Sequence, residues 1–207
     1  MALTRSGLAC HRGEVRWEQL FADLDARFED LADAQMMAEL ADRQRVAAGG
    51  VTMVQRFAGA LGTPVRLRTQ DGVALGGMVL EVGPDWLLLD QQGPGELLVA
   101  MRAVTAVEGL TAASGAPLDR VGRKLDLRLA LRGIARDRSP VVVTLTGAAA
   151  PETGRGPEIG GTIDRVGADF LELAQHAVWE PRRASGVRSV ALLPLQAVVA
   201  VRSMPAG

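Results

Sequence analysis

The sequence is short of the residues on which most catalytic and metal sites depend. Among its 207 residues there are one cysteine, Cys10, two histidines, His11 and His176, and no tyrosine. A single cysteine forms neither an internal disulfide nor, alone, a zinc site. The Gly-x-Ser-x-Gly motif of a serine nucleophile is also missing. We therefore expect a protein that is not an enzyme, with no catalytic residues, no metal and no cofactor, in a reducing cytoplasm.

A charge imbalance and long hydrophobic runs are absent as well. The 23 Lys and Arg side chains against 24 Asp and Glu give a formal net charge of -1. This balance gives no bulk attraction to nucleic acid or to an anionic membrane. No stretch approaches the ~20 apolar residues of a membrane span, and residues 1–7 lack the apolar run of a signal peptide. With 48% hydrophobic residues, we expect a soluble, intracellular protein with a packed core and no membrane partner.

What the sequence does contain is an internal repeat. Residues 76–89 (GGMVLEVGPDWLLL) return as residues 160–173 (GGTIDRVGADFLEL), and half of the positions are identical. A glycine pair inside a strand is typical of a bulge or a sharp bend, and Val-Gly-x-Asp is typical of a turn. The repeat therefore predicts two β-rich segments of similar construction, each containing one long bent strand.

Helical periodicity precedes each β-rich segment. From Glu14 to Gly49-Gly50 an apolar stripe recurs at helical spacing opposite an acidic face, and it consists of Trp17, Leu20, Phe21, Leu24, Phe28 and Leu31. A short helix is predicted over residues 51–61. Residues 118–137 fit both a strand and a helix, and the repeat favours a helix over at least residues 125–136. Because the stripe of the first helix needs a cover, we expect a homo-oligomer or a protein partner through this helix, or packing on the β-rich segments.

Each β-rich segment divides into five predicted strands, bounded by turn signals such as Asp71-Gly72. The predicted strands are residues 65–69, 73–82, 86–90, 97–101 and 104–107, then 141–146, two strands within 160–173, 190–193 and 197–201. The expected fold is α+β: an N-terminal helical segment followed by two tandem five-stranded small β-barrels, each preceded by a helix. The expected boundaries are residues 1–50 for the lead and acidic helix, 51–110 for the first barrel, 111–117 for a linker and 118–207 for the second barrel.

This layout resembles the Sm-like (Lsm-type) small β-barrels, and more loosely the SH3-like barrels. The resemblance covers roughly residues 53–108 and 129–202 and rests on Gly-x-(Val/Ile)-x-x-Val-Gly-x-Asp followed by Leu-x-Leu. The whole chain also resembles tandem-barrel proteins of high-GC bacteria. The resemblance to the Sm-like family implies ring assembly and single-stranded RNA binding. The family's RNA-binding positions hold Asp85-Trp86 and Arg102-Ala103 in the first barrel, and Asp169-Phe170 and Gln196-Ala197 in the second.

The function that the sequence favours is a non-catalytic interaction or scaffold module. Trp86 and Phe170 occupy equivalent positions, and we expect them to close the barrel mouth, with base stacking as the alternative. The alternative function is a regulator that binds RNA or another nucleic acid through a basic helix at 118–138 and the loop 175–188. The candidate interaction residues are Trp86, Arg102, Arg128, Arg132, Arg136, Trp179, Arg182 and Arg183.

Overall fold

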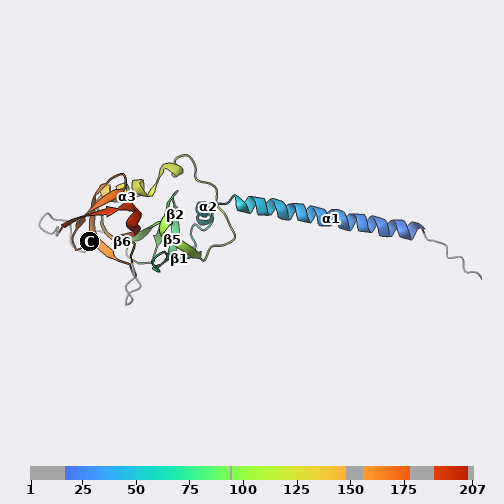
Figure 1. Ribbon diagram of the computed structural model, residues 1–207, viewed down its shortest axis with the longest axis horizontal. Coiled ribbons are helices and arrows are strands. Elements are labelled where there is room, and N and C mark those ends of the chain that lie inside the picture. Colours follow the sequence, from blue (N-terminus) through green and yellow to red (C-terminus); the bar gives the residue numbers. More distant parts are fainter. Residues whose placement is uncertain (1–16, 94, 148–155, 178–188, 205–207) are drawn as a thin grey trace, which may run out of the picture. The chain divides into compact units, whose positions relative to one another are not determined.

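The computed structural model describes residues 17–93, 95–147, 156–177 and 189–204 (Figure 1). The chain divides into two compact units, residues 1–50 and residues 51–207. Within the described residues, the first unit is one long helix, and the second unit holds two short α-helices and ten strands. The α+β class and the N-terminal helix predicted from the sequence are therefore confirmed.

The helix of the first unit is α1 (Trp17–Gly49). Its predicted start at Glu14 lies outside the described residues, and its end at Gly49 agrees with the predicted interruption. The side chains of Leu24, Phe28 and Leu31 in the predicted apolar stripe are 40%, 67% and 60% exposed. Over Leu24, Phe28 and Leu31 the stripe is therefore an exposed apolar face of this unit. No helix within the described ranges is long and apolar enough to cross a membrane.

The second unit consists of two halves of the same construction. The first half, residues 51–110, contains α2 (Met53–Ala58), β1 (Pro64–Thr69), β2 (Ala74–Val82), β3 (Trp86–Asp90), β4 (Glu96–Ala100) and β5 (Val104–Glu108). The second half, residues 118–207, contains α3 (Leu127–Asp137), β6 (Pro140–Leu145), β7 (Glu158–Val166), β8 (Phe170–Gln175), β9 (Ser189–Pro194) and β10 (Val198–Ser203). A short 3-10 turn joins the last two strands of each half, η1 (Met101–Ala103) and η4 (Leu195–Ala197).

The ten strands form one open antiparallel sheet in the order β5-β1-β2-β3-β4-β10-β6-β7-β8-β9. Each half follows the same order, because β10, β6, β7, β8 and β9 correspond to β5, β1, β2, β3 and β4. A five-stranded sheet closes into a barrel only when its two outer strands pair with each other. Here β4 pairs with β10 of the other half, and β5 and β9 are the ends of the sheet. The two predicted five-stranded barrels are therefore not confirmed: the sheet is not closed, and the halves share it.

The two helices of the second unit begin with polar caps. At α2 the Thr52 hydroxyl accepts the Gln55 N–H at 3.3 Å, and the Gln55 side chain accepts the Thr52 N–H at 2.9 Å. This reciprocal capping box satisfies backbone donors that the first turn leaves unpaired. At α3 the Asp126 carboxylate accepts the Leu129 N–H at 2.8 Å. The helix predicted over at least residues 125–136 is present from Leu127, and its first turn is fixed by the Asp126 cap.

Phe57 and Leu131 are the counterparts that anchor α2 and α3 in their cores. Both side chains are 0% exposed, and each follows its helix cap at the same spacing. Aligning the helices through the Pro-Val pairs that begin β1 and β6 would instead place Gln55 opposite Leu131. The difference arises because α3 has 11 residues and α2 has six. The extra turn of α3 lies after its buried anchor.

The segment between the halves runs over α2 without helix or strand. The Arg56 guanidinium donates to the carbonyls of Ala112 at 2.6 Å and Ala113 at 2.7 Å, and also to that of Thr111. The Gly115 N–H donates to the Gln55 carbonyl at 2.8 Å. Residues 111–117, predicted as a linker, are therefore hydrogen-bonded to the helix that starts the first half.

The glycine pairs of the repeat allow close strand approach. A Cβ on Gly77 would lie 2.4 Å from the Asp90 carbonyl oxygen, and one on Gly161 would lie 2.2 Å from that of Ala174. Real Cβ atoms do not approach so closely, so both positions require glycine. The irregularity predicted at the glycines occurs further along, where the register shifts between Val79 and Glu81 and between Ile163 and Arg165. The bend in each long strand is thus a bulge beyond the glycine pair.

Candidate functional site

The junction between the halves is formed by β4 and β10. These antiparallel strands pair Leu97 with Arg202, Leu98 with Val201 and Val99 with Ala200. Each of the two strands contributes a side chain to the apolar cluster of the other half. Leu98 belongs to the apolar cluster of the second half, and Ala200 belongs to that of the first. The junction is therefore an interlocked core rather than a contact between two finished surfaces.

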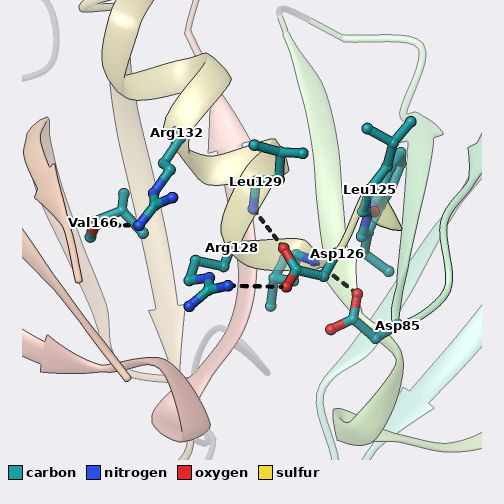
Figure 2. A network of polar contacts seen from close by, with 9 residues as sticks. Asp85, Leu125, Asp126, Arg128, Leu129, Arg132 and Val166 are labelled. Atoms are coloured by element: carbon teal, nitrogen blue, oxygen red, sulfur yellow. Dashed lines mark hydrogen bonds and ion pairs between the residues drawn. The ribbon is translucent and has the colours of Figure 1, made fainter. Parts of the chain in front are cut away.

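The end of the β2–β3 turn and the first residue of β3 form hydrogen bonds with the start of α3. The Trp86 indole N–H donates to the Leu125 carbonyl at 2.6 Å, and the Asp85 carboxylate accepts the Leu127 N–H at 2.7 Å. Figure 2 shows Asp85 below the first turn of α3, beside the Asp126 cap. An acidic side chain at a helix start also opposes the positive end of the helix dipole. Asp85 and Trp86 thus fix the position of α3 relative to the first half.

Trp86 is 6% exposed and packs in the apolar cluster of the second half. The preceding Gly83 is required for this placement, because a Cβ there would lie 2.2 Å from the indole ring. Phe170 takes the corresponding position in the second half and is only half-buried. Because the Trp86 ring is covered by other side chains, it is not a free platform on which a base could stack.

Arg102 also lies at the junction. Its guanidinium donates to the Val198 carbonyl at 3.0 Å and to the Leu195 carbonyl. Burial lowers the pKa of Arg102 below its usual value, and the negative charge of Asp85 partly opposes this by raising it. The cation is therefore committed to backbone oxygens of the second half. Its counterpart in the second half, Gln196, is exposed.

The three arginines predicted on α3 differ in their contacts. Arg128 is 3.7 Å from the Asp126 carboxylate, and Arg132 donates to the Val166 carbonyl at 3.4 Å (Figure 2). Arg136 is exposed in the last turn. Two of the three therefore have contacts within the second half. The remaining predicted residues, Trp179, Arg182 and Arg183, lie outside the described residues.

Beside α3, the junction leaves an apolar groove that the sequence did not predict. Its volume is about 330 Å³. It is lined by Glu81, Trp86, Leu88, Glu96, Leu98, Leu125, Leu129, Ala130, Ile134, Val201 and Ser203. The helical spacing of Leu125 and Leu129 was visible in the sequence, but the strands they would face could not be identified without the β4–β10 pairing. Among the described residues, no group of three or more His, Cys, Asp or Glu side chains could hold a metal ion.

At the two ends of the sheet, two of the positions that are buried at the junction are exposed. Leu98 of β4 is 4% exposed, whereas its counterpart in β9, Leu192, is 60% exposed. Ala200 of β10 is 0% exposed, whereas its counterpart in β5, Ala106, is exposed. The free edges thus carry apolar residues at the positions by which the two halves are joined.

Comparisons of the chain with protein-family models, with curated proteins and with solved structures found no match. The geometry of the junction, the groove and the free edges is therefore the basis for every functional inference below.

Proposed function

We propose that the second unit is a non-catalytic assembly module that joins copies of this chain head to tail, β9 of one copy pairing with β5 of the next. The β4–β10 junction carries this proposal, because β9 corresponds to β4 and β5 corresponds to β10. The chain thus contains one example of the contact that it would repeat between copies. Such a contact joins two different edges, so successive copies form a closed ring or an open filament.

On this proposal each half is one Sm-like or SH3-like five-stranded subunit. The support is the repeated strand order, the bulge at the same place in β2 and β7, and the 3-10 turn before the last strand. Both edges of an open sheet carry unpaired backbone groups, and proteins usually shield such edges with charge, proline or a covering segment. Strand β9 contains no charged residue, and its Val190 and Leu192 are each 60% exposed.

The internal junction also predicts the register between copies. Val201 lies opposite Leu98, and Ala200 lies opposite Val99. The corresponding pairs between copies are Val107 with Leu192 and Ala106 with Leu193. The carboxylate of Asp169, at the position of Asp85, would then face the N-terminus of α2 in the next copy. Phe170 cannot donate the hydrogen bond that Trp86 makes, so the contact between copies is weaker than the junction within one.

The expected affinity is low. Covering a side chain such as Leu192 stabilises a contact by about 1–2 kcal/mol, and each ladder hydrogen bond adds about 1 kcal/mol. Association costs at least about 4 kcal/mol in lost freedom of motion. A single contact is therefore expected to be visible only at high protein concentration. A closed ring gains stability because every copy makes two contacts.

Disulfide trapping tests the register. In a Cys10→Ser background, Val107→Cys and Leu192→Cys are combined in one chain and oxidised at rising protein concentration. Opposed residues of antiparallel strands have Cα atoms about 4.5–5.5 Å apart, within the range that a disulfide spans. We expect a ladder of covalent multimers on a non-reducing gel. The control combines Thr105→Cys with Leu192→Cys, which is two residues out of register. Equal trapping in both variants, or none in either, refutes the proposal.

A charge on the free edge tests association without a crosslink. Leu192→Lys should abolish the concentration dependence of the mass in sedimentation velocity, because it places an ammonium group in the apolar contact. Val121→Lys is the matched control, since Val121 is 64% exposed and belongs to neither edge strand. The same loss of association in both variants would contradict an edge-to-edge contact.

The N-terminal helix and nucleic acid are the competing explanations. Association that survives Leu192→Lys but is lost in Phe28→Glu/Leu31→Glu would assign the contact to the apolar stripe of α1. Salt-sensitive binding of single-stranded RNA, lost in Arg128→Gln/Arg132→Gln/Arg136→Gln and without a change in mass, would replace the assembly proposal with nucleic-acid binding.

A further inference from the structure

We propose that the groove between α3 and strands β2, β3, β4 and β10 binds a small amphiphilic cation, a compact apolar body that carries one ammonium or guanidinium group. The groove is lined by neither β5 nor β9, so this inference goes beyond the assembly proposed above. If one of the two proposals is refuted, the other is not affected.

The floor of the groove is one row of side chains across four strands. Glu81 lies opposite Leu88, Leu88 opposite Leu98, and Leu98 opposite Val201. With neighbouring strands about 4.8 Å apart, this row is about 14 Å long. Because the four residues are successive cross-strand neighbours, they lie on the same face of the sheet.

The wall of the groove is the side of α3 that faces the first half. Leu129, Ala130 and Ile134 line it, together with Leu125 just before the helix. Leu125 and Leu129 are 38% and 42% exposed, because α3 packs mainly on β7 of the second half. On the wall, and at the half-buried Leu88 of the floor, apolar side chains therefore remain accessible, and an apolar ligand would cover them.

The charge in the groove has one sign. Glu81 and Glu96 are its charged lining residues, and no Lys, Arg or His side chain is among them. Glu81 stands at one end of the floor row. Glu96 belongs to the next row, where its backbone N–H donates to Ser203 Oγ at 3.0 Å. Neither carboxylate forms an ion pair within the part of the chain that the structure describes. Two unpaired carboxylates beside an apolar surface favour a cation and disfavour an anion.

The repeat indicates that folding does not require this lining. Arg165 and Val190 stand in the second half where Glu81 and Glu96 stand in the first, and Glu172 replaces Leu88. Arg165 and Glu172 form an ion pair at 3.6 Å. The same strand layout is thus built with different chemistry, so the two carboxylates and the apolar floor are particular to the first half.

The size of the groove favours a small molecule. A volume of about 330 Å³ lies at the lower end of the range of roughly 300–1,000 Å³ for small-molecule sites. It corresponds to about eleven water molecules at ~30 Å³ each. A folded macromolecule would need a larger contact surface than one row of four strands provides.

Two probes of equal chain length and opposite charge test the proposal on the full chain. We expect n-octylammonium to bind at least about 10-fold more tightly than octanoate by isothermal titration calorimetry. Glu81→Gln/Glu96→Gln should bring the two affinities within about 2-fold of each other, because it removes the charge and keeps the shape. Glu172→Gln is the matched control, since it removes a carboxylate from the corresponding row of the second half, and it should retain the preference.

A second variant tests the place of binding. Ala130→Phe fills the groove from the α3 side without touching either carboxylate, and it should weaken octylammonium binding at least about 10-fold. Its folding is checked by circular dichroism; if it fails to fold, the exposed Glu81→Gln/Glu96→Gln pair alone decides. Equal affinity of the wild type for both probes, no binding of octylammonium, or a preference that survives the glutamine pair each overturns the proposal.

Discussion

Trp86→Phe is the substitution that tests most directly whether the junction holds the two halves together. It places in the first half the residue that the second half carries at position 170. The substitution keeps an aromatic ring but removes the indole N–H that donates to the Leu125 carbonyl at 2.6 Å. It also replaces the two-ring indole by a smaller phenyl ring at a position that is only 6% exposed.

The expected loss combines two effects. The Leu125 carbonyl loses its donor in a partly buried position, which costs about 1–3 kcal/mol. The smaller ring leaves unfilled space between the halves, and a loss of this size in a packed core costs about 1–2 kcal/mol more. We therefore expect the free energy of unfolding to fall by about 2–5 kcal/mol. The effect should be cooperative, because Trp86 packs in the cluster of the second half although it belongs to the first.

Urea unfolding followed by circular dichroism measures this loss without relying on tryptophan fluorescence. The matched control is Phe170→Leu, at the corresponding half-buried position, where we expect a loss of no more than about 1.5 kcal/mol. A loss below about 0.5 kcal/mol for Trp86→Phe would refute the reasoning. Unchanged stability together with weaker RNA binding would indicate that the ring serves base stacking instead.

Three further predictions concern the elements that hold the halves. Asp126→Ala removes the cap of α3 and should lower the free energy of unfolding by about 1 kcal/mol, whereas Asp126→Ser should restore most of it. Gly77→Ala places a Cβ 2.4 Å from the Asp90 carbonyl oxygen and should cost about 2–4 kcal/mol, whereas Gly93→Ala, with nothing within 4 Å, should cost less than about 0.5 kcal/mol. Phe57→Ala and Leu131→Ala should cost about 3–5 and 2–5 kcal/mol if these residues are equivalent anchors. Urea midpoints at constant slope measure all of these, and a neutral Gly77→Ala would contradict the close approach of β2 and β3.

The strands and helices were predictable because each depends on local chemistry. Alternation marks β1, where the exposed and buried residues follow one another without exception from Pro64 to Thr69. The repeat settled the ambiguity over residues 118–137, and the Asp126 cap explains why a helix forms there. Hydrophobic period and capping act within a few residues, so one sequence is sufficient to predict them.

The joining of the halves was not predictable, because it depends on which edges meet. β4 and β10 are far apart in the sequence, and both contain runs of buried residues that would suit a closed barrel equally well. Trp86 illustrates the difficulty. We expected its ring to be buried within the first half, but its indole N–H donates to the carbonyl of Leu125 in the second half. Arg102 likewise donates to carbonyls that no motif indicates.

The differences between the two halves show where the sequence is free to serve function. Gly77 and Gly161 are both required by a close carbonyl, and Phe57 and Leu131 are both fully buried, so the fold explains these pairs. The fold does not explain why Glu81 and Glu96 border an apolar floor while Arg165 and Glu172 neutralise each other in the second half. Nor does it explain why Leu192 is exposed where Leu98 is buried, unless another surface covers it. The first difference is the basis for the proposed ligand, and the second is the basis for the proposed contact with a neighbouring copy. Each proposal can be tested by a substitution on the protein surface.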